Sequence, residues 1–194
     1  MYHKILFSAA ILILGFCFSV NAQDKADTIS RDYVVNLKGD TIKGPVLWIS
    51  DGSLKIDPFS ETHTVKYKAD EIKEACKTGQ VYVPIRVSLT FRDIVIVKRI
   101  EHGAINLYEY VQTSYNNSGS QTTWYANKGD GKVTEIKTSG MGGISRAERK
   151  KNFLALIADN DQLTKKFQSQ DDFSFDVLQD LIRQYNQQGG GKAK

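Results

Sequence analysis

The spacing of hydrophobic residues changes twice along this chain of 194 residues. Residues 5–20 form an uncharged apolar run. From residue 32 to about 137, short runs rich in Val, Ile, Tyr and Thr alternate with Gly, Asp and Asn, and after Gly143 apolar residues recur at helical spacing. In order, these patterns predict a leader, a β domain and C-terminal helices.

The apolar run at the start is typical of a secretory signal peptide. Lys4 precedes it, and Val20-Asn21-Ala22 places small residues at the −3 and −1 positions of a cut before Gln23. The run is shorter than the about 20 apolar residues that a membrane span requires. We therefore predict a signal peptide at 1–22, a flexible polar leader at 23–31, and a product exported to the periplasm or the cell exterior.

The middle of the chain predicts a β domain over residues 32–138. About nine short strands with no long helix between them favour an antiparallel small barrel or sandwich over a parallel sheet. An outer-membrane barrel is disfavoured, because its strands have about 10 residues. The expected strands are Tyr33–Leu37, Thr41–Ile49, Ser53–Ile56, His63–Lys68, Val81–Val87, Asp93–Ile100, Ala104–Gln112, Thr122–Asn127 and Val133–Ile136. Between the fourth and fifth, the i, i+3, i+4 spacing of Ile72, Ala75 and Cys76 predicts a short helix over Ala69–Cys76.

The end of the chain predicts a Gly-rich joint at 139–144, helices within 145–187 and a disordered tail at 188–194. Ser145 and Glu148 form a capping box that starts the first helix. Its apolar stripe is interrupted near Asp159–Asp161, and a second helix begins around Asp172. The apolar positions are Phe153, Leu156, Ile157, Leu163 and Phe167, then Leu178, Leu181, Ile182 and Tyr185. Each helix has one apolar face, so the pair should pack on the β domain, giving an α+β fold that is mostly β.

Composition narrows the possible partners. The formal charge is +4, and basic residues are interleaved with acidic ones, which argues against a nucleic-acid partner. Cys17 leaves with the signal peptide, so Cys76 has no partner for an intramolecular disulfide. Lipidation of Cys17 is disfavoured because the bulky Phe16 precedes it, and we expect no stable membrane insertion after signal cleavage.

Residues for metal binding or catalysis are sparse. His63 and His102 each lack a second ligand at i+2 or i+4, so both are interpreted as solvated side chains. Cys76 lies on the apolar side of its predicted helix, which favours a buried, inert thiol over a nucleophile. No Gly-x-Ser-x-Gly motif occurs. We predict no catalytic residue, no metal and no cofactor.

Two loops have a possible ligand-binding interpretation. Gly140–Gly143 precedes a helix whose first turns carry basic residues, an arrangement that can bind anions. The lysine of a phosphate loop is missing, however, which favours a joint between the β domain and the helices. Asp159–Asp161 faintly suggests calcium, but the Gly and the closing Glu of a calcium loop are absent, which favours helix capping.

Aromatic residues gather on two strands that should pair. Alternation places Ile105, Leu107 and Val111 on one face and Tyr108 and Tyr110 on the other. The tyrosine face is either half-exposed and binds a partner or glycan, or covered by the C-terminal helices. The candidate ligand-binding residues are Tyr108, Tyr110, Trp124 and Tyr125, with Tyr115 close by in the sequence.

Three stretches resemble a group of uncharacterised exported proteins of Bacteroidota-type bacteria. These are the opening Tyr33–Gly44, the strand His63–Lys68 with the turn Ala69–Ala75, and an ending like Leu163…Phe167…Leu178…Ile182…Tyr185-Asn186. The resemblance implies no activity or cofactor. The opening strand–Gly–strand also looks like the start of small SH3-like or Sm-like barrels, although their basic RNA-binding loop is missing. Asp-Thr-Ile, at Thr28 and Thr41, resembles an O-glycosylation acceptor of such bacteria.

Together these observations predict a non-enzymatic exported protein that acts through surface contacts with an unknown protein or glycan. The alternative is a small-molecule or glycan-binding module that uses the aromatic face. An enzyme is the third hypothesis, because no set of titratable groups converges in the sequence.

Overall fold

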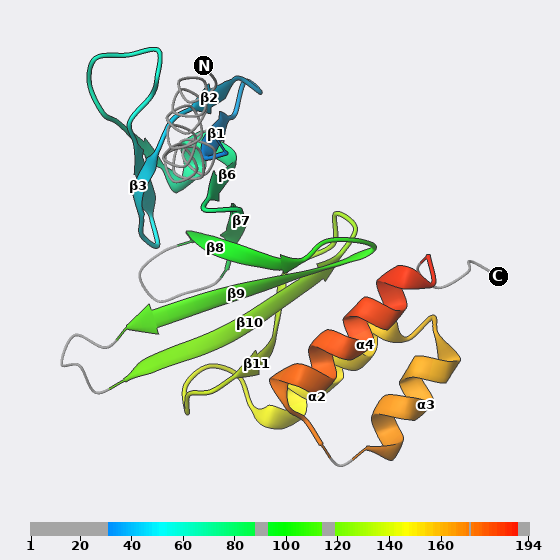
Figure 1. Ribbon diagram of the computed structural model, residues 1–194. Helices are drawn as coiled ribbons and strands as arrows, with labels where there is room; N and C mark the ends of the chain where they lie inside the picture. Colours follow the sequence, from blue (N-terminus) through cyan, green and yellow to red (C-terminus); the bar gives the residue numbers. More distant parts are fainter. Residues whose placement is uncertain (1–30, 88–92, 114–118, 171, 190–194) are drawn as a thin grey trace, which may run out of the picture.

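The computed structural model describes residues 31–87, 93–113, 119–170 and 172–189. The chain has an α+β fold that is mostly β, with antiparallel sheets followed by C-terminal helices that pack on them, as the sequence predicts (Figure 1). The predicted signal peptide and most of the predicted leader and tail lie outside the described residues. None of the described helices is long and apolar enough to span a membrane.

Two antiparallel sheets contain all the described strands. The large sheet has eight strands in the order β11 (Thr134–Thr138), β10 (Ser120–Lys128), β9 (Ile105–Thr113), β8 (Ile94–Glu101), β7 (Gln80–Arg86), β6 (Ile72–Lys77), β1 (Tyr33–Asn36) and β2 (Thr41–Lys43). The small sheet has three, in the order β3 (Val46–Ile49), β4 (Ser53–Ile56) and β5 (Val65–Lys68). Neither sheet closes into a barrel.

In the N-terminal half, which runs from β1 to β7, the small sheet packs face to face on one end of the large sheet. Leu54 and Ile56 of β4 contact Val34 of β1, Ile72 of β6 and Ile96 of β8 in one apolar core. This half therefore has the layered arrangement of a sandwich.

The chain passes from the large sheet to the small one at Gly44-Pro45. Gly44 has a φ of 153°, and a Cβ there would lie 2.0 Å from the carbonyl oxygen of Asp57. Only glycine fits this close approach of two backbones. The predicted strand Thr41–Ile49 is for this reason two strands, β2 and β3.

The helix predicted over Ala69–Cys76 is wrong. A single turn of 3-10 helix, η1 (Ala69–Glu71), is followed directly by β6. The register against β1 shifts beside Lys73, since Asn36 pairs with Ile72 and Val35 with Glu74. This bulge lets Ile72 and Ala75 share the core face at a spacing of three, which imitates a helical period.

Three helices, rather than the predicted pair, follow the sheets: α2 (Arg146–Ile157), α3 (Asp161–Ser169) and α4 (Phe175–Gln187). The extra helix arises where the chain turns at residues 158–160, and the side chain of Asn160 caps α3 by accepting from the amide of Leu163 at 3.1 Å. Ser145 caps α2 as predicted, accepting from the amide of Glu148 at 3.1 Å.

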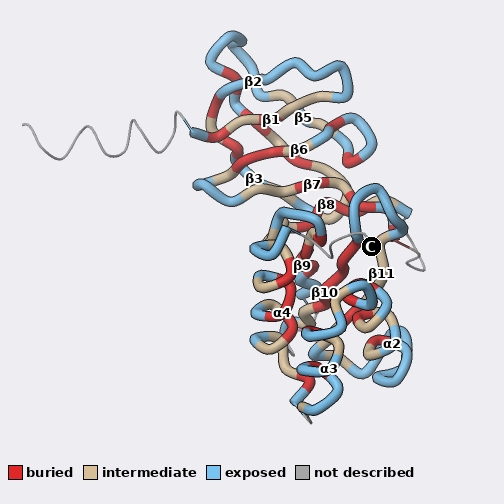
Figure 2. Tube along the Cα trace, turned by 90° about the vertical axis from the view of Figure 1, so that its right-hand side faces the viewer, coloured by how far each residue is buried: buried red, intermediate tan, exposed pale blue. Residues whose placement is uncertain are grey.

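The helices cover one face of β9, β10 and β11. Their buried side chains share a core with Ile105, Leu107, Trp124, Ala126 and Ile136 of those strands. Figure 2 shows the buried residues running along the strands and along the helix faces turned toward them. The continuous large sheet thus has one apolar core at each end, and a third core lies on β7, β8, β9 and β10 between them.

Candidate functional site

The aromatic candidates do not form one exposed face. Tyr108, Tyr110 and Tyr125 lie on one side of β9 and β10, whereas Trp124 lies on the other side, among the helices. All four are buried, with exposed fractions of 8%, 5%, 7% and 5% for Tyr108, Tyr110, Tyr125 and Trp124. The expectation of a half-exposed tyrosine face is therefore wrong.

The cover of the tyrosine face also differs from the alternative expectation. Its buried apolar neighbours come from β7, from β8 and from the residue that follows β7, and Tyr125 also lines a cavity with Glu148 and Asn152 of α2. The residues packed against the tyrosines are Val83, Ile85, Val87, Val95 and Val97. Tyr115 lies outside the described residues.

The polar ends of Tyr108, Tyr110 and Trp124 are hydrogen-bonded. The hydroxyl of Tyr108 donates to Asn127 Oδ1 at 3.0 Å, and the indole nitrogen of Trp124 donates to Glu109 Oε2 at 3.3 Å. Burial and then the hydrogen bond to Asp51 raise the pKa of Tyr110 to about 12. Burial and then the charge of Glu135 raise the pKa of Tyr125 to about 12. Both hydroxyls are therefore neutral at physiological pH.

A V-shaped opening in the large sheet lies beside Tyr110. Strands β8 and β9 pair only from Lys98–Glu109 to Glu101–Leu107, and beyond Lys98 they diverge (Figure 1). The turn between β3 and β4 enters the opening. There the carbonyl of Asp51 accepts from the amide of Ile96 at 2.7 Å, and its carboxylate accepts from the hydroxyl of Tyr110 at 2.9 Å.

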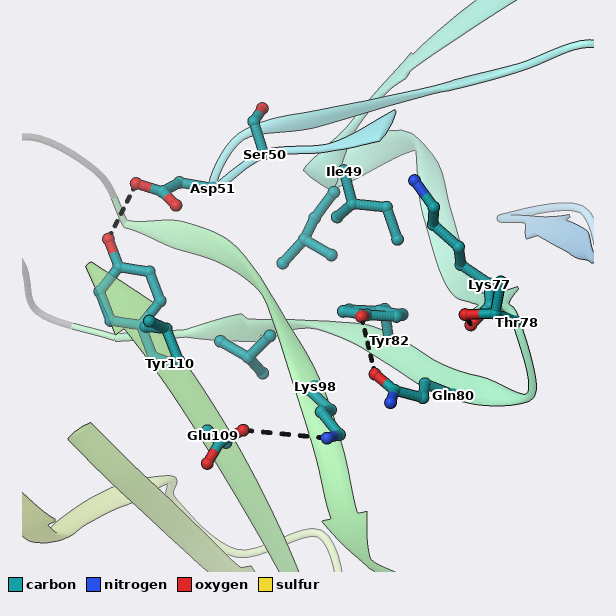
Figure 3. A pocket seen from close by; sticks show the side chains of 13 residues that line it. Ile49, Ser50, Asp51, Lys77, Thr78, Gln80, Tyr82, Lys98, Glu109 and Tyr110 are labelled. Carbon is teal, nitrogen blue, oxygen red and sulfur yellow. Dashed lines mark hydrogen bonds and ion pairs between the residues drawn. The ribbon is translucent and has the colours of Figure 1, made fainter. Parts of the chain in front are cut away.

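A cavity of about 430 Å³, the junction cleft, lies at this opening, between the two halves of the molecule (Figure 3). It is lined by Ile49, Ser50, Asp51, Lys77, Thr78, Gln80, Tyr82, Ile96, Val97, Lys98, Glu109, Tyr110 and Val111. Apolar walls and hydrogen-bonding groups are combined here, as is usual in binding sites.

The charges of the junction cleft balance. Lys98 Nζ lies 4.0 Å from Glu109 Oε1, and Lys77 Nζ donates to the carbonyl of Leu47 at 2.7 Å. Burial, followed by the charge of Glu109, raises the pKa of Tyr82, whose hydroxyl donates to Gln80 at 3.1 Å. The cleft therefore offers a ligand both positively charged hydrogen-bond donors and negatively charged acceptors.

Groups suited to metal binding or nucleophilic attack are not gathered in the described part of the chain. There, no three His, Cys, Asp or Glu residues are placed to hold a metal ion. His63 is exposed beside Glu61, and His102 Nδ1 lies 2.7 Å from Asn106 Oδ1. Cys76 is buried, and burial raises the pKa of its thiol.

One edge of β9 borders the junction cleft. β10 pairs with β9 along its whole length, but over Tyr110–Thr113 no described strand pairs with its other side. Val111 is 47% exposed, and Gln112 and Thr113 are also exposed. This edge carries neither a charge nor a proline, the usual protections of an open strand edge. The alternation of apolar and polar residues does not predict this edge, because it does not show where two neighbouring strands separate.

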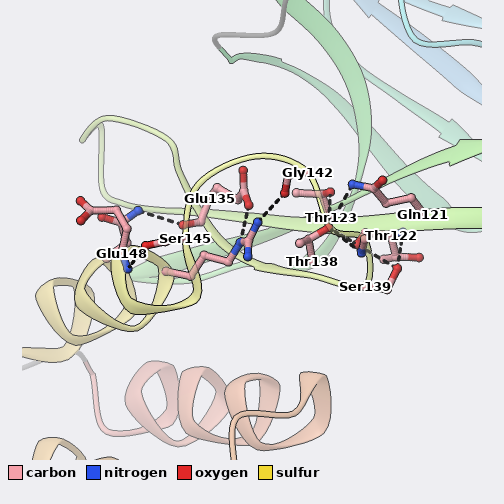
Figure 4. A network of polar contacts seen from close by, with 12 residues as sticks. Gln121, Thr122, Thr123, Glu135, Thr138, Ser139, Gly142, Ser145 and Glu148 are labelled. Carbon is pink, nitrogen blue, oxygen red and sulfur yellow. Dashed lines mark hydrogen bonds and ion pairs between the residues drawn. The ribbon is translucent and has the colours of Figure 1, made fainter.

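The Gly-rich joint is tied to the sheet by a polar network (Figure 4). Arg149 donates to the carbonyl of Gly142 at 2.7 Å and also pairs with Glu135 of β11. The amide of Gly140 donates to Thr138 Oγ1 at 3.2 Å. The network fixes the start of α2 against β11.

Comparisons of this chain with protein-family models, with curated proteins and with solved structures found no match.

Proposed function

We propose that this chain is a non-enzymatic exported protein that acts through surface contacts, and that it binds an extended segment of a partner protein along the Tyr110–Thr113 edge of β9. The observation that carries the proposal is the edge of β9 next to the junction cleft, with which no described strand pairs over Tyr110–Thr113. The signal-like pattern of residues 1–22 supports export to the periplasm or the cell exterior.

Strand addition is the recognition mode that fits this edge. In an antiparallel sheet every second residue turns its amide and carbonyl toward a given neighbour, so a partner strand would find a row of main-chain partners. The junction cleft would receive a side chain of that strand, and Lys98 and Glu109 would contact its polar groups.

The glycan-binding alternative has less support. Its proposed aromatic face is buried, and of the four candidate residues only Tyr110 lines the junction cleft. Tyr82 is a second aromatic side chain there, but its hydroxyl and that of Tyr110 already have protein partners.

The proposal is tested with a phage-displayed library of random peptides, selected against the protein. We expect Val111→Lys to weaken a selected peptide by about tenfold or more, because a lysine at an open edge discourages strand pairing. The matched control is Leu37→Lys, which places the same charge at an exposed residue outside the lining of the cleft. The bound peptide should also protect from hydrogen exchange those amides of Tyr110–Thr113 that face away from β10.

Failure to select any peptide, or equal affinity for wild type and Val111→Lys, would contradict strand addition. So would a peptide that binds without protecting those amides. A folded, dispersed NMR spectrum of each variant excludes loss of binding through unfolding.

A further inference from the structure

A second cavity of about 430 Å³ lies where β11 meets the beginnings of α2 and α4. We call it the basic pocket. Its lining residues are Lys137, Thr138, Arg146, Arg149, Asp172, Phe173 and Ser174. None of them lines the junction cleft, and none belongs to the Gly-rich joint.

Three cationic side chains surround the ring of Phe173. Lys137 Nζ lies 4.8 Å from the ring centroid, Lys150 Nζ lies 5.6 Å from it, and Arg146 Cζ lies 5.7 Å from it. Phe173 is 4% exposed, so the ring forms a fixed apolar floor between the charges. Cations over an aromatic face gain some stabilisation, but three of them around one ring also repel each other.

The positive charge of this cluster is only partly compensated. In the described part of the chain, Lys137, Arg146 and Lys150 have no carboxylate within ion-pair distance. Arg149 is neutralised by Glu135. Burial, followed by the charges of Arg146 and Arg149, lowers the pKa of Lys137. Asp172 is the acidic residue of the lining, and its carboxylate accepts from Ser174 Oγ at 3.0 Å.

Two helix N-termini add to the positive potential. Arg146 is the first residue of α2, and Ser174 is the N-cap of α4. The N-terminal end of a helix carries a positive partial charge, which favours anions and disfavours cations. Lys137 Nζ already donates to the carbonyl of Phe173. A bound anion would in addition offset the repulsion between the cations and the helix N-termini.

We propose that the basic pocket binds a phosphate or sulfate group. Lys137 would supply its ammonium group and Arg146 its guanidinium, and amides in the first turn of α4 would complete the set. Lys150 does not line the pocket, but it would add positive charge beside the Phe173 ring. A dianion fits better than a carboxylate, because it interacts with more of the three cations and outweighs the repulsion from Asp172.

The site is tested by titrating the protein with sodium phosphate, sodium sulfate and sodium acetate at constant ionic strength, followed by amide NMR shifts. Phosphate or sulfate should cause saturable shifts at Thr138 and Phe173–Asp176. Acetate should bind about tenfold more weakly, having one charge instead of about two. The dianion with the lower Kd identifies the chemical source of the group, and equal values mean that the pocket recognises charge.

Substitutions distinguish binding of an anion in the pocket from its non-specific attraction to the positive charge of the surface. The double variant Lys137→Gln, Arg146→Gln should weaken dianion binding by about tenfold or more, since both cations that line the pocket without a carboxylate partner are lost. Lys151→Gln is the matched control on the helix of Arg146: Lys151 is exposed, pairs with Glu148 and does not line the pocket, so its effect should stay within about twofold. Asp172→Asn should strengthen binding.

The proposal is overturned if neither dianion causes saturable shifts, or if acetate binds as well as both of them. It is also overturned if Lys151→Gln weakens binding as much as the double variant does. Dispersed spectra of the variants verify that each is folded.

Discussion

The carboxylate of Asp32 is buried and accepts hydrogen bonds from two backbone amides that are far apart in the sequence. Oδ2 accepts from Val46 at 3.1 Å, and Oδ1 accepts from Thr78 at 2.6 Å. Thr78 has a positive φ of 50°, in the tight turn between β6 and β7. One side chain thus ties the start of the β domain to β3 and to this turn.

Asp32→Asn should lower the free energy of unfolding by about 1–3 kcal/mol, because an amide has only one oxygen and leaves a buried backbone donor unpaired. Urea denaturation monitored by circular dichroism measures the change. Asp57→Asn, at an exposed position, should change stability by less than about 0.5 kcal/mol. Equal effects of the two substitutions would show that Asp32 has no special role.

At the scale of single residues, the sequence predicts what depends on near neighbours. The cap at Ser145 follows from a spacing of three residues, and the structure has it. The role of Asp32 depends on partners 14 and 46 residues away, so no local pattern indicates it. The open edge at Val111 is missed for the same reason.

Among the secondary-structure elements, α4 is docked on the sheet through Asn186. Its side-chain amide exchanges two hydrogen bonds with the backbone of Ile105, each 2.8 Å long. The fit is close, since a Cβ on Gly103 would lie 2.5 Å from Asn186 Cγ. The side chain of Asn186, in the last turn of α4, therefore forms with Ile105 the pair of hydrogen bonds that a neighbouring strand would form.

Asn186→Ala should destabilise the protein by about 1–3 kcal/mol, because it leaves a buried donor and acceptor of Ile105 without partners. Thermal unfolding is a suitable measurement. Gln187→Ala, the next residue on the same helix, is exposed and serves as the control. A Tm of the Asn186 variant equal to that of the control would contradict this view of the docking.

The helices and strands are predicted correctly where their apolar residues recur at a regular spacing. The apolar positions predicted for the C-terminal helices are all buried. The prediction fails at β6, where the bulge beside Lys73 gives a strand the spacing of a helix turn. A period read over four or five residues cannot distinguish a bulged strand from a short helix.

Across the whole molecule, sheet and helices are joined by a polar contact between Lys128 of β10, Asp159 and Tyr185 of α4. Lys128 Nζ lies 2.6 Å from Asp159 Oδ2, and the Tyr185 hydroxyl donates to the same oxygen at 2.8 Å. Burial alone would raise the pKa of the Asp159 carboxyl, but the hydrogen bonds from Lys128 and Tyr185 outweigh it and hold the pKa below its ordinary value of 3.8.

Because folding lowers the pKa of Asp159, the contact stabilises the fold at pH values above the ordinary pKa of 3.8. This stabilisation is lost as the pH falls below that value. Asp159→Asn should therefore reduce stability at neutral pH, by less than about 1 kcal/mol because the pair is partly exposed. The difference from wild type should shrink below pH 3.8. Urea midpoints over a range of pH test this, and a difference that grows on acidification would refute it.

The overall fold class follows from the sequence, but the cover of the tyrosine face does not. Alternation correctly separates Ile105 and Leu107 from Tyr108 and Tyr110. It cannot tell which layer covers each side, because that depends on how strongly a sheet bends. The position of the junction cleft cannot be predicted from the sequence either, because its lining comes from strands in both halves of the molecule.

The continuity of the large sheet limits how this protein can be dissected. Ile96 belongs to β8, the first strand after Arg86, yet its side chain completes the apolar interior of the N-terminal half. A fragment ending at Arg86 would leave that interior open to water. The complementary fragment would expose the edge of β8 that pairs with β7 in the whole protein. The two halves are therefore better studied together, as a single folding unit, than expressed apart.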